Sequence, residues 1–143
     1  MHVAWSMVDT MSVPFAVEDL DHVVLRCRDR ERALDFYTKV LGLPEERRLD
    51  AIGMIQLRAG RSLVDLVPRA EGEATGPGNV EHFCLGVAGA DMAAIVTYLE
   101  RAGVELLGDP MVRYGARGYR ESIYLRDPEG NVVELTTGPS RSQ

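Results

Sequence analysis

Two histidines and two carboxylates occupy matching positions in the two halves of the chain. His22 is the second residue of the run DHVVL, and His82 is the second residue of the run EHFCL. Asp65 lies within LVDL, and Glu134 lies within VVEL. A carboxylate between apolar neighbours on a buried strand is costly unless its charge is compensated. A divalent cation would compensate it.

These side chains are therefore predicted to bind one divalent metal ion. Imidazole nitrogen and carboxylate oxygen at ~2.0 to 2.2 Å suit zinc, and the same donors suit iron, nickel, cobalt or manganese. We predict His22, His82 and Glu134 as ligands, and Asp65 as a fourth ligand. Alternatively, the shorter Asp65 side chain holds a metal-bound water or orients a ligand histidine. Each residue taken singly is also compatible with an ordinary core or surface position.

Three protein ligands leave metal positions open to two neighbouring oxygens of a substrate. The metal would act as a Lewis acid, while a carboxylate moves a proton between adjacent carbons. Glu134 is the first choice for this catalytic base, and Asp65 is the second.

The first strand also offers a substrate-binding residue. A period of two places Arg26 on the same strand face as His22, where it suits an anionic group of a small-molecule substrate. A structural salt bridge is the alternative interpretation of Arg26.

A second group of candidates lies in the later half. Arg113 and Arg120 flank the segment 112–120, which is interpreted as a Gly- and Arg-rich loop that closes over an anion. Arg117 in the same segment is interpreted as a solvated charge. Tyr124 is predicted to face the site and to donate a hydrogen bond, although most strand tyrosines are core or interface residues.

The elements that must position these residues follow one pattern twice. A strand-like run, a helix that begins after an aspartate (Asp29 or Asp91) and ends at a glycine (Gly42 or Gly103), and further strands are predicted in each half. The predicted strands are 20–27, 46–50, 52–58, 62–67, 80–87, 104–107, 121–126 and 131–136. The sequence thus predicts an α+β fold of two tandem βαβββ modules that form a curved mixed sheet around a metal cleft.

The predicted domain covers residues 20–137. Module one spans 20–67, a Gly- and Pro-rich linker spans 68–79, and module two spans 80–137. Residues 1–19 are interpreted as an N-terminal extension, and residues 138–143 as a C-terminal tail.

Composition excludes several classes of protein. A length of 143 residues suits one domain, and a net charge of −6 argues against a nucleic-acid partner. No apolar run approaches the ~20 residues that span a bilayer, so no membrane association is predicted. Residues 1–19 lack the features of a secretory signal, and Cys27 and Cys84 lack a CxxC partner. A cytoplasmic protein with reduced thiols is expected.

Three stretches carry a resemblance to a known family: LDHVVLRCRDRERALDFYTKVLGL, EHFCLGV and SIYLRDPEGNVVEL. The chain resembles the vicinal oxygen chelate superfamily, also called the glyoxalase, bleomycin-resistance and extradiol-dioxygenase group. The resemblance implies two βαβββ modules around a metal cleft, often completed in a homodimer. His22, His82 and Glu134 match the metal-ligand positions of the family. Asp65 occupies the fourth, where glyoxalase I-like members carry Glu, and Arg26 matches their glutathione-contacting Arg.

The resemblance implies a metal-dependent lyase or isomerase of glyoxalase I type. One alternative is a three-ligand dioxygenase or antibiotic-resistance transferase; the tail TTGPSRSQ lacks the basic extension associated with fosfomycin-resistance members. The other is a non-catalytic small-molecule-binding protein of bleomycin-resistance type, whose members generally lack the metal ligands that are complete here.

Overall fold

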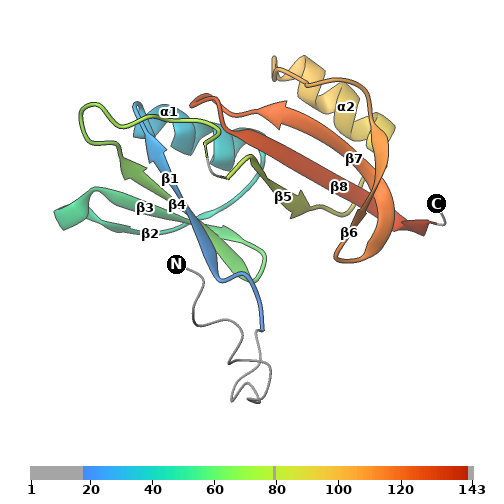
Figure 1. Ribbon diagram of the computed structural model, residues 1–143, viewed down its shortest axis with the longest axis horizontal. Coiled ribbons are helices and arrows are strands. Elements are labelled where there is room, and N and C mark those ends of the chain that lie inside the picture. The colour runs from blue at the N-terminus through green and yellow to red at the C-terminus, as the bar shows by residue number, and fades with distance from the viewer. Residues whose placement is uncertain (1–17, 79, 142–143) are drawn as a thin grey trace, which may run out of the picture.

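The computed structural model of the protein describes residues 18–78 and 80–141, and it contains two similar modules. Figure 1 shows the two sheets side by side, with β1 and β5 nearest to each other between them. The elements of module one are β1 (His22–Cys27), α1 (Arg30–Asp35), the π-helical turn η2 (Phe36–Val40), β2 (Glu45–Leu49), the 3-10 turn η3 (Asp50–Ile52), β3 (Met54–Ala59) and β4 (Ser62–Pro68). Those of module two are β5 (His82–Gly86), α2 (Met92–Arg101), β6 (Met111–Gly115), β7 (Gly118–Arg126) and β8 (Val132–Arg141).

The two sheets have the same topology. The strand order is β1-β4-β3-β2 in one sheet and β5-β8-β7-β6 in the other. The pairs β1/β4 and β5/β8 are parallel, and the remaining pairs are antiparallel. The α+β fold of two βαβββ modules is thus confirmed. The mixed sheet is divided into two four-stranded sheets, since no strand of one module pairs with a strand of the other in the described residues.

The helices begin where the sequence predicts. The Asp29 side chain accepts a hydrogen bond from the N–H of Arg32 at 3.0 Å, and Asp91 accepts one from Ala94 at 2.9 Å. Each bond satisfies an N–H that has no partner within the first helical turn. Helix α2 then buries Met92, Ile95 and Leu99 against its sheet, following helical spacing.

Strand periodicity gives each sheet a core face and an opposite face. In β1, Leu25 and Cys27 are buried, whereas His22, Val24 and Arg26 are exposed. The buried apolar residues of β7 and β8 alternate in the same way with polar ones. The polar faces are therefore available to build a site.

Two sequence expectations were wrong. The segment 112–120 is a β-hairpin in which β6 pairs with β7, and the Tyr114 and Tyr119 rings meet edge to face with centroids 4.9 Å apart. The segment 104–107 is not a strand; of its residues, only Leu106 forms a β-bridge, with Leu125. The hairpin was interpreted as a loop because its sequence is rich in glycine and arginine and shows little alternation of apolar residues. Residues 1–17 of the expected N-terminal extension lie outside the described part, and β8 runs through 138–141 of the expected tail.

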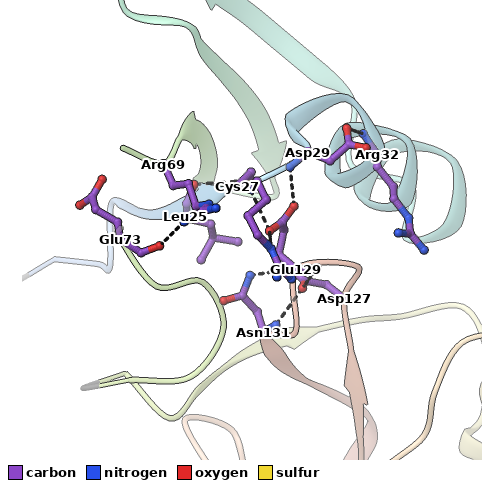
Figure 2. Close-up of polar contacts among 10 residues, drawn as sticks. Leu25, Cys27, Asp29, Arg32, Arg69, Glu73, Asp127, Glu129 and Asn131 are labelled. Carbon is purple, nitrogen blue, oxygen red and sulfur yellow. Dashed lines mark hydrogen bonds and ion pairs between the residues drawn. The ribbon is translucent and has the colours of Figure 1, made fainter. Parts of the chain in front are cut away.

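Buried carboxylates of the β7–β8 turn join the two modules. The Glu129 carboxylate, 3% exposed, accepts hydrogen bonds from the backbone N–H groups of Arg28 at 2.8 Å and Asp29 at 2.7 Å. The Tyr37 hydroxyl donates a hydrogen bond to Asp127 Oδ2 at 2.5 Å. Figure 2 shows Glu129 beneath Asp29, with Asp127 in the same turn. We call the contacts of Asp127 and Glu129 with module one the intermodule clasp.

Candidate functional site

Module two gathers four side chains on the sheet face opposite its core. Cys84 on β5 and Tyr124 on β7 are the register partners of Glu134 on β8, so the three share one face. His82 lies on the same face, two residues before Cys84. Their neighbours Ile123 and Val133 are fully buried on the other side of the sheet. Strand register therefore assembles this group without help from a loop.

The predicted ligands His82 and Glu134 are in contact. His82 Nε2 lies 3.1 Å from Glu134 Oε1, and the Glu134 carboxylate is buried. The His82 ring also meets the Tyr124 ring edge to face, with centroids 5.2 Å apart. An imidazole nitrogen and a carboxylate oxygen thus lie at hydrogen-bond distance, which brings two of the predicted ligands together.

The negative charge of Glu134 perturbs its neighbours. Burial raises the pKa of the Cys84 thiol to about 12, and the charge of Glu134 and a hydrogen bond with it add to that effect. Burial also raises the pKa of Tyr124; a hydrogen bond with Arg113 opposes this rise, while Glu134 reinforces it. Both neighbours therefore stay protonated near neutral pH and can donate to the carboxylate.

Module one places His22 and Asp65 on one face of its sheet, with His22 exposed and Asp65 buried. His22 Nδ1 lies 2.7 Å from Asp21 Oδ2. The pKa of His22 is raised, chiefly by the hydrogen bond with Asp21; burial opposes this rise, and the charge of Asp65 adds to it. Asp65 is 2% exposed, and both of its carboxylate oxygens lie 3.2 Å from Gln56 Nε2. Arg47 donates in turn to Gln56 Oε1 at 2.7 Å.

The two histidines face a shared cavity of about 530 Å³, which strands β1, β4 and β5 line. Within residues 18–78 and 80–141, however, no three His, Cys, Asp or Glu side chains lie close enough to hold one metal ion. The four predicted ligands are thus arranged as two pairs, His22 with Asp65 and His82 with Glu134. Their nitrogen and oxygen donors suit a borderline divalent cation. The two pairs must approach each other to bind one ion, and the metal site is a prediction.

Comparison with known proteins identifies the family of the chain. The family model for the Glyoxalase/Bleomycin resistance protein/Dioxygenase superfamily matches residues 19–135. The chain belongs to this superfamily. The resemblance seen in the three sequence stretches is therefore confirmed.

Several relatives within the glyoxalase superfamily cover most of the chain. Virulence protein STM3117 of Salmonella typhimurium is 27% identical, over 87% of this chain and 88% of its own. Lactoylglutathione lyase of Pseudomonas aeruginosa is 25% identical over 80% of both chains. Among solved structures, VPC_CASS1 from the mobile metagenome of V. Pseudocholerae has a TM-score of 0.72 and 31% identity, over 87% of this chain and 98% of its own.

Arg26 lines a cavity with His82, but its guanidinium already forms an ion pair with Glu73. Arg26 Nε lies 2.8 Å from Glu73 Oε2, and the N–H of Ala70 donates to the other Glu73 oxygen at 2.6 Å. Arg26 and His82 line a second cavity of about 220 Å³, closed on one side by residues 74–78. The salt-bridge interpretation of Arg26 is thus supported, while contact with an anionic substrate stays a prediction.

Sequence reasoning missed three residues that shape the site. Gln56 alternates with buried Ile55 and Leu57 in β3, a signal that could have placed it beside Asp65. Cys84 was expected only as a buried, reduced thiol, but it is exposed and stands two residues after His82 on the same strand face. Glu73 gave no signal, because nothing in a linker sequence indicates which strand its side chain will contact.

The described part of the chain contains no helix that is both long enough and apolar enough to cross a membrane.

Proposed function

We propose that this protein is a metal-dependent enzyme of the glyoxalase superfamily, a lyase or isomerase acting on a small substrate that chelates the metal through adjacent oxygens. The observation that carries the proposal is the contact of 3.1 Å between His82 Nε2 and the buried carboxylate of Glu134. Burial of a charged carboxylate among apolar strand neighbours costs free energy, and a bound cation would offset that cost. The name of one relative, lactoylglutathione lyase, supports the reaction class.

His22, His82 and Glu134 would hold the metal, which supplies Lewis acidity toward the two substrate oxygens. Glu134 would accept a proton from one substrate carbon and return it to the next, with Asp65 as the second candidate for this role. The amide of Gln56 holds Asp65 by both oxygens, which limits the rotation of that carboxylate. Tyr124, beside His82, and Arg26, which lines a cavity with His82, would contact the substrate.

The separation of the two ligand pairs supports a site completed by a second copy of the chain. In a homodimer, His22 and Asp65 of one subunit would approach the His82 and Glu134 pair of the other. Mixed dimers of His22→Ala with His82→Ala test this arrangement. A shared site restores one intact ligand set in each mixed dimer, and so restores metal binding. A site formed within one chain restores none.

The direct test of the proposed function is the metal content of protein purified without chelator. We expect about one divalent ion per site, lost in His22→Ala, His82→Ala and Glu134→Ala. Glu105→Gln is a matched control, because Glu105 is exposed and pairs with Arg126 outside the site. Wild-type protein that holds no metal and gains none on addition of zinc, nickel, cobalt, manganese or iron would refute the proposal.

The contact between Gln56 and Asp65 favours a second candidate. If Asp65 stays bound to Gln56, the metal has three protein ligands, as in a dioxygenase or an antibiotic-resistance transferase. Bound ferrous iron with oxygen-dependent turnover of a catechol would support the dioxygenase. Nickel, cobalt, zinc or manganese with turnover of a hydroxy-carbonyl compound would support the lyase or isomerase.

A further inference from the structure

The β6–β7 hairpin places two arginines directly opposite each other. Arg113 and Arg120 are register partners in the antiparallel pair, so their side chains share one face of the sheet. Like charges in such positions repel unless a counter-charge lies between them. Yet no ion pair among the described residues includes either guanidinium.

Arg120 is the buried member of the pair. Only 8% of the residue is exposed, and its Nε donates to the carbonyl of Gly138 at 2.7 Å. The guanidinium extends to β5, where a Cβ on Gly86 would lie 3.8 Å from Nη1. A buried cation without an acidic partner is costly, and a bound anion would remove that cost.

Ser122 adds an unused donor beside the arginines. It lies two residues after Arg120 on the same strand face and is 2% exposed. Its hydroxyl has no hydrogen-bond partner within the described residues. Thr136, the register partner of Ser122, uses its own hydroxyl on the carbonyl of Glu121. The buried hydroxyl of Ser122 is therefore free to donate to a ligand.

Strand geometry sets the distance from this group to the proposed metal site. Tyr124 is the register partner of Glu134, while Ser122 and Arg120 lie two and four residues before it on β7. At about 3.3 Å per residue, these positions are roughly 7 and 13 Å from the Glu134 row. A substrate chelated at Glu134 would reach them with a group several bonds away.

We propose that Arg113, Arg120 and Ser122 form an oxyanion-binding subsite, which takes a carboxylate, phosphate or phosphonate group of the substrate. The guanidinium groups supply charge and paired N–H donors, and Ser122 supplies a neutral donor. The identity of the anion as part of a substrate rests on the proposed function. Binding of the anion itself does not, because none of the three residues is a proposed metal ligand.

Calorimetric titration of chelator-treated protein with inorganic phosphate, methylphosphonate and acetate, at constant ionic strength in chloride, tests the subsite. We expect saturable binding by the wild type and a loss of about tenfold in affinity for Arg120→Gln. Preference for phosphate and methylphosphonate over acetate would identify a phosphoryl group, and the reverse preference a carboxylate. Arg117→Gln is the matched control, since it removes the same charge from the exposed turn of the same hairpin and should retain wild-type affinity.

Because Arg120 is buried, two further variants keep the test independent of folding. Arg113→Gln changes an exposed side chain, and Ser122→Ala removes only the unpaired hydroxyl; each should weaken phosphate binding while circular dichroism stays unchanged. Absence of saturable binding by the wild type, or equal losses in Arg113→Gln and Arg117→Gln, would overturn the proposal. His82→Ala should lose metal and keep phosphate binding, which separates failure of the subsite from failure of the metal site.

Discussion

Replacement of Glu129 by Gln tests whether the intermodule clasp stabilises the fold. The Glu129 carboxylate accepts one backbone N–H on each oxygen, from Arg28 and from Asp29. Glutamine keeps the shape but turns one oxygen into an NH₂ group, which faces an N–H donor instead of accepting from it. The variant therefore loses the charge on one bond and leaves one partly buried backbone N–H without a partner.

The expected cost follows from these two losses. A hydrogen bond to a charged group contributes about 1.5 to 3 kcal/mol, and a buried donor left unsatisfied costs about 1 to 3 kcal/mol. Because the losses overlap, we expect Glu129→Gln to lower the free energy of unfolding by roughly 2 to 4 kcal/mol. For a chain of this length, the melting temperature should fall by roughly 6 to 15 °C.

Urea unfolding followed by far-UV circular dichroism measures this change. The control is Glu46→Gln, because Glu46 pairs with Arg58 at the surface and should matter much less. An unfolding free energy for Glu129→Gln that matches that of the control would refute the assignment of the clasp as a stabilising contact. Separate transitions for the two modules in the variant would show that the clasp also couples them.

The pH dependence of the same variant has a defined sign. Burial raises the pKa of the Glu129 carboxyl, but the N–H groups of Arg28 and Asp29 and the Arg28 side chain outweigh burial, so the pKa lies below its usual value of 4.5. A lowered folded-state pKa gives stability that is present above about pH 4.5 and is lost as the pH falls through the folded-state value. The stability difference between wild type and Glu129→Gln should therefore narrow below pH 4.5. A difference that widens there would contradict this reasoning.

Further substitutions test other contacts. Tyr37→Phe should lower the unfolding free energy by about 1 to 3 kcal/mol, because the buried hydroxyl donates to Asp127. Burial and then the charge of Asp127 raise the pKa of Tyr37 well above 10.0, so wild-type stability should fall as the pH rises above 10, and an equally steep fall in Tyr37→Phe would argue against this origin. Gly53→Ala should destabilise more than Gly42→Ala in thermal unfolding. Both have positive φ, but a Cβ at Gly53 would lie 2.8 Å from Arg30 Nη1 and one at Gly42 would meet nothing within 4 Å; equal losses would show that Arg30 moves aside freely.

Local patterns predicted much of the fold. The aspartate caps, the glycine helix ends and the apolar runs of β1, β4, β5 and β8 depend on neighbours within a few residues, and the structure confirms them. The β6–β7 hairpin was missed because its edge strand β6 is exposed along its whole length and so lacks an apolar face. An exposed strand leaves no periodic signal.

The candidate site was predictable as residue types but not as a geometry. The internal repeat placed His82 on the first strand of its module and Glu134 on the last, and the structure pairs these two strands in parallel, which brings the side chains together. The distance between the two ligand pairs depends on how one module lies against the other. Contacts such as that of Glu129 with Asp29 join residues about a hundred positions apart, and no local pattern in the turn DPEGN indicates that partner.

The division into two sheets has a consequence for how the cavity adapts. Strands within a sheet are fixed at about 4.8 Å spacing by backbone hydrogen bonds, but in the described chain no such ladder crosses from β1 to β5. The distance between His22 and His82 is therefore not restricted to multiples of the spacing between strands. It depends on how the two modules pack, through contacts such as those of Glu129 with Arg28 and Asp29, so we expect substitutions at these contacts to change the cavity and leave both sheets intact.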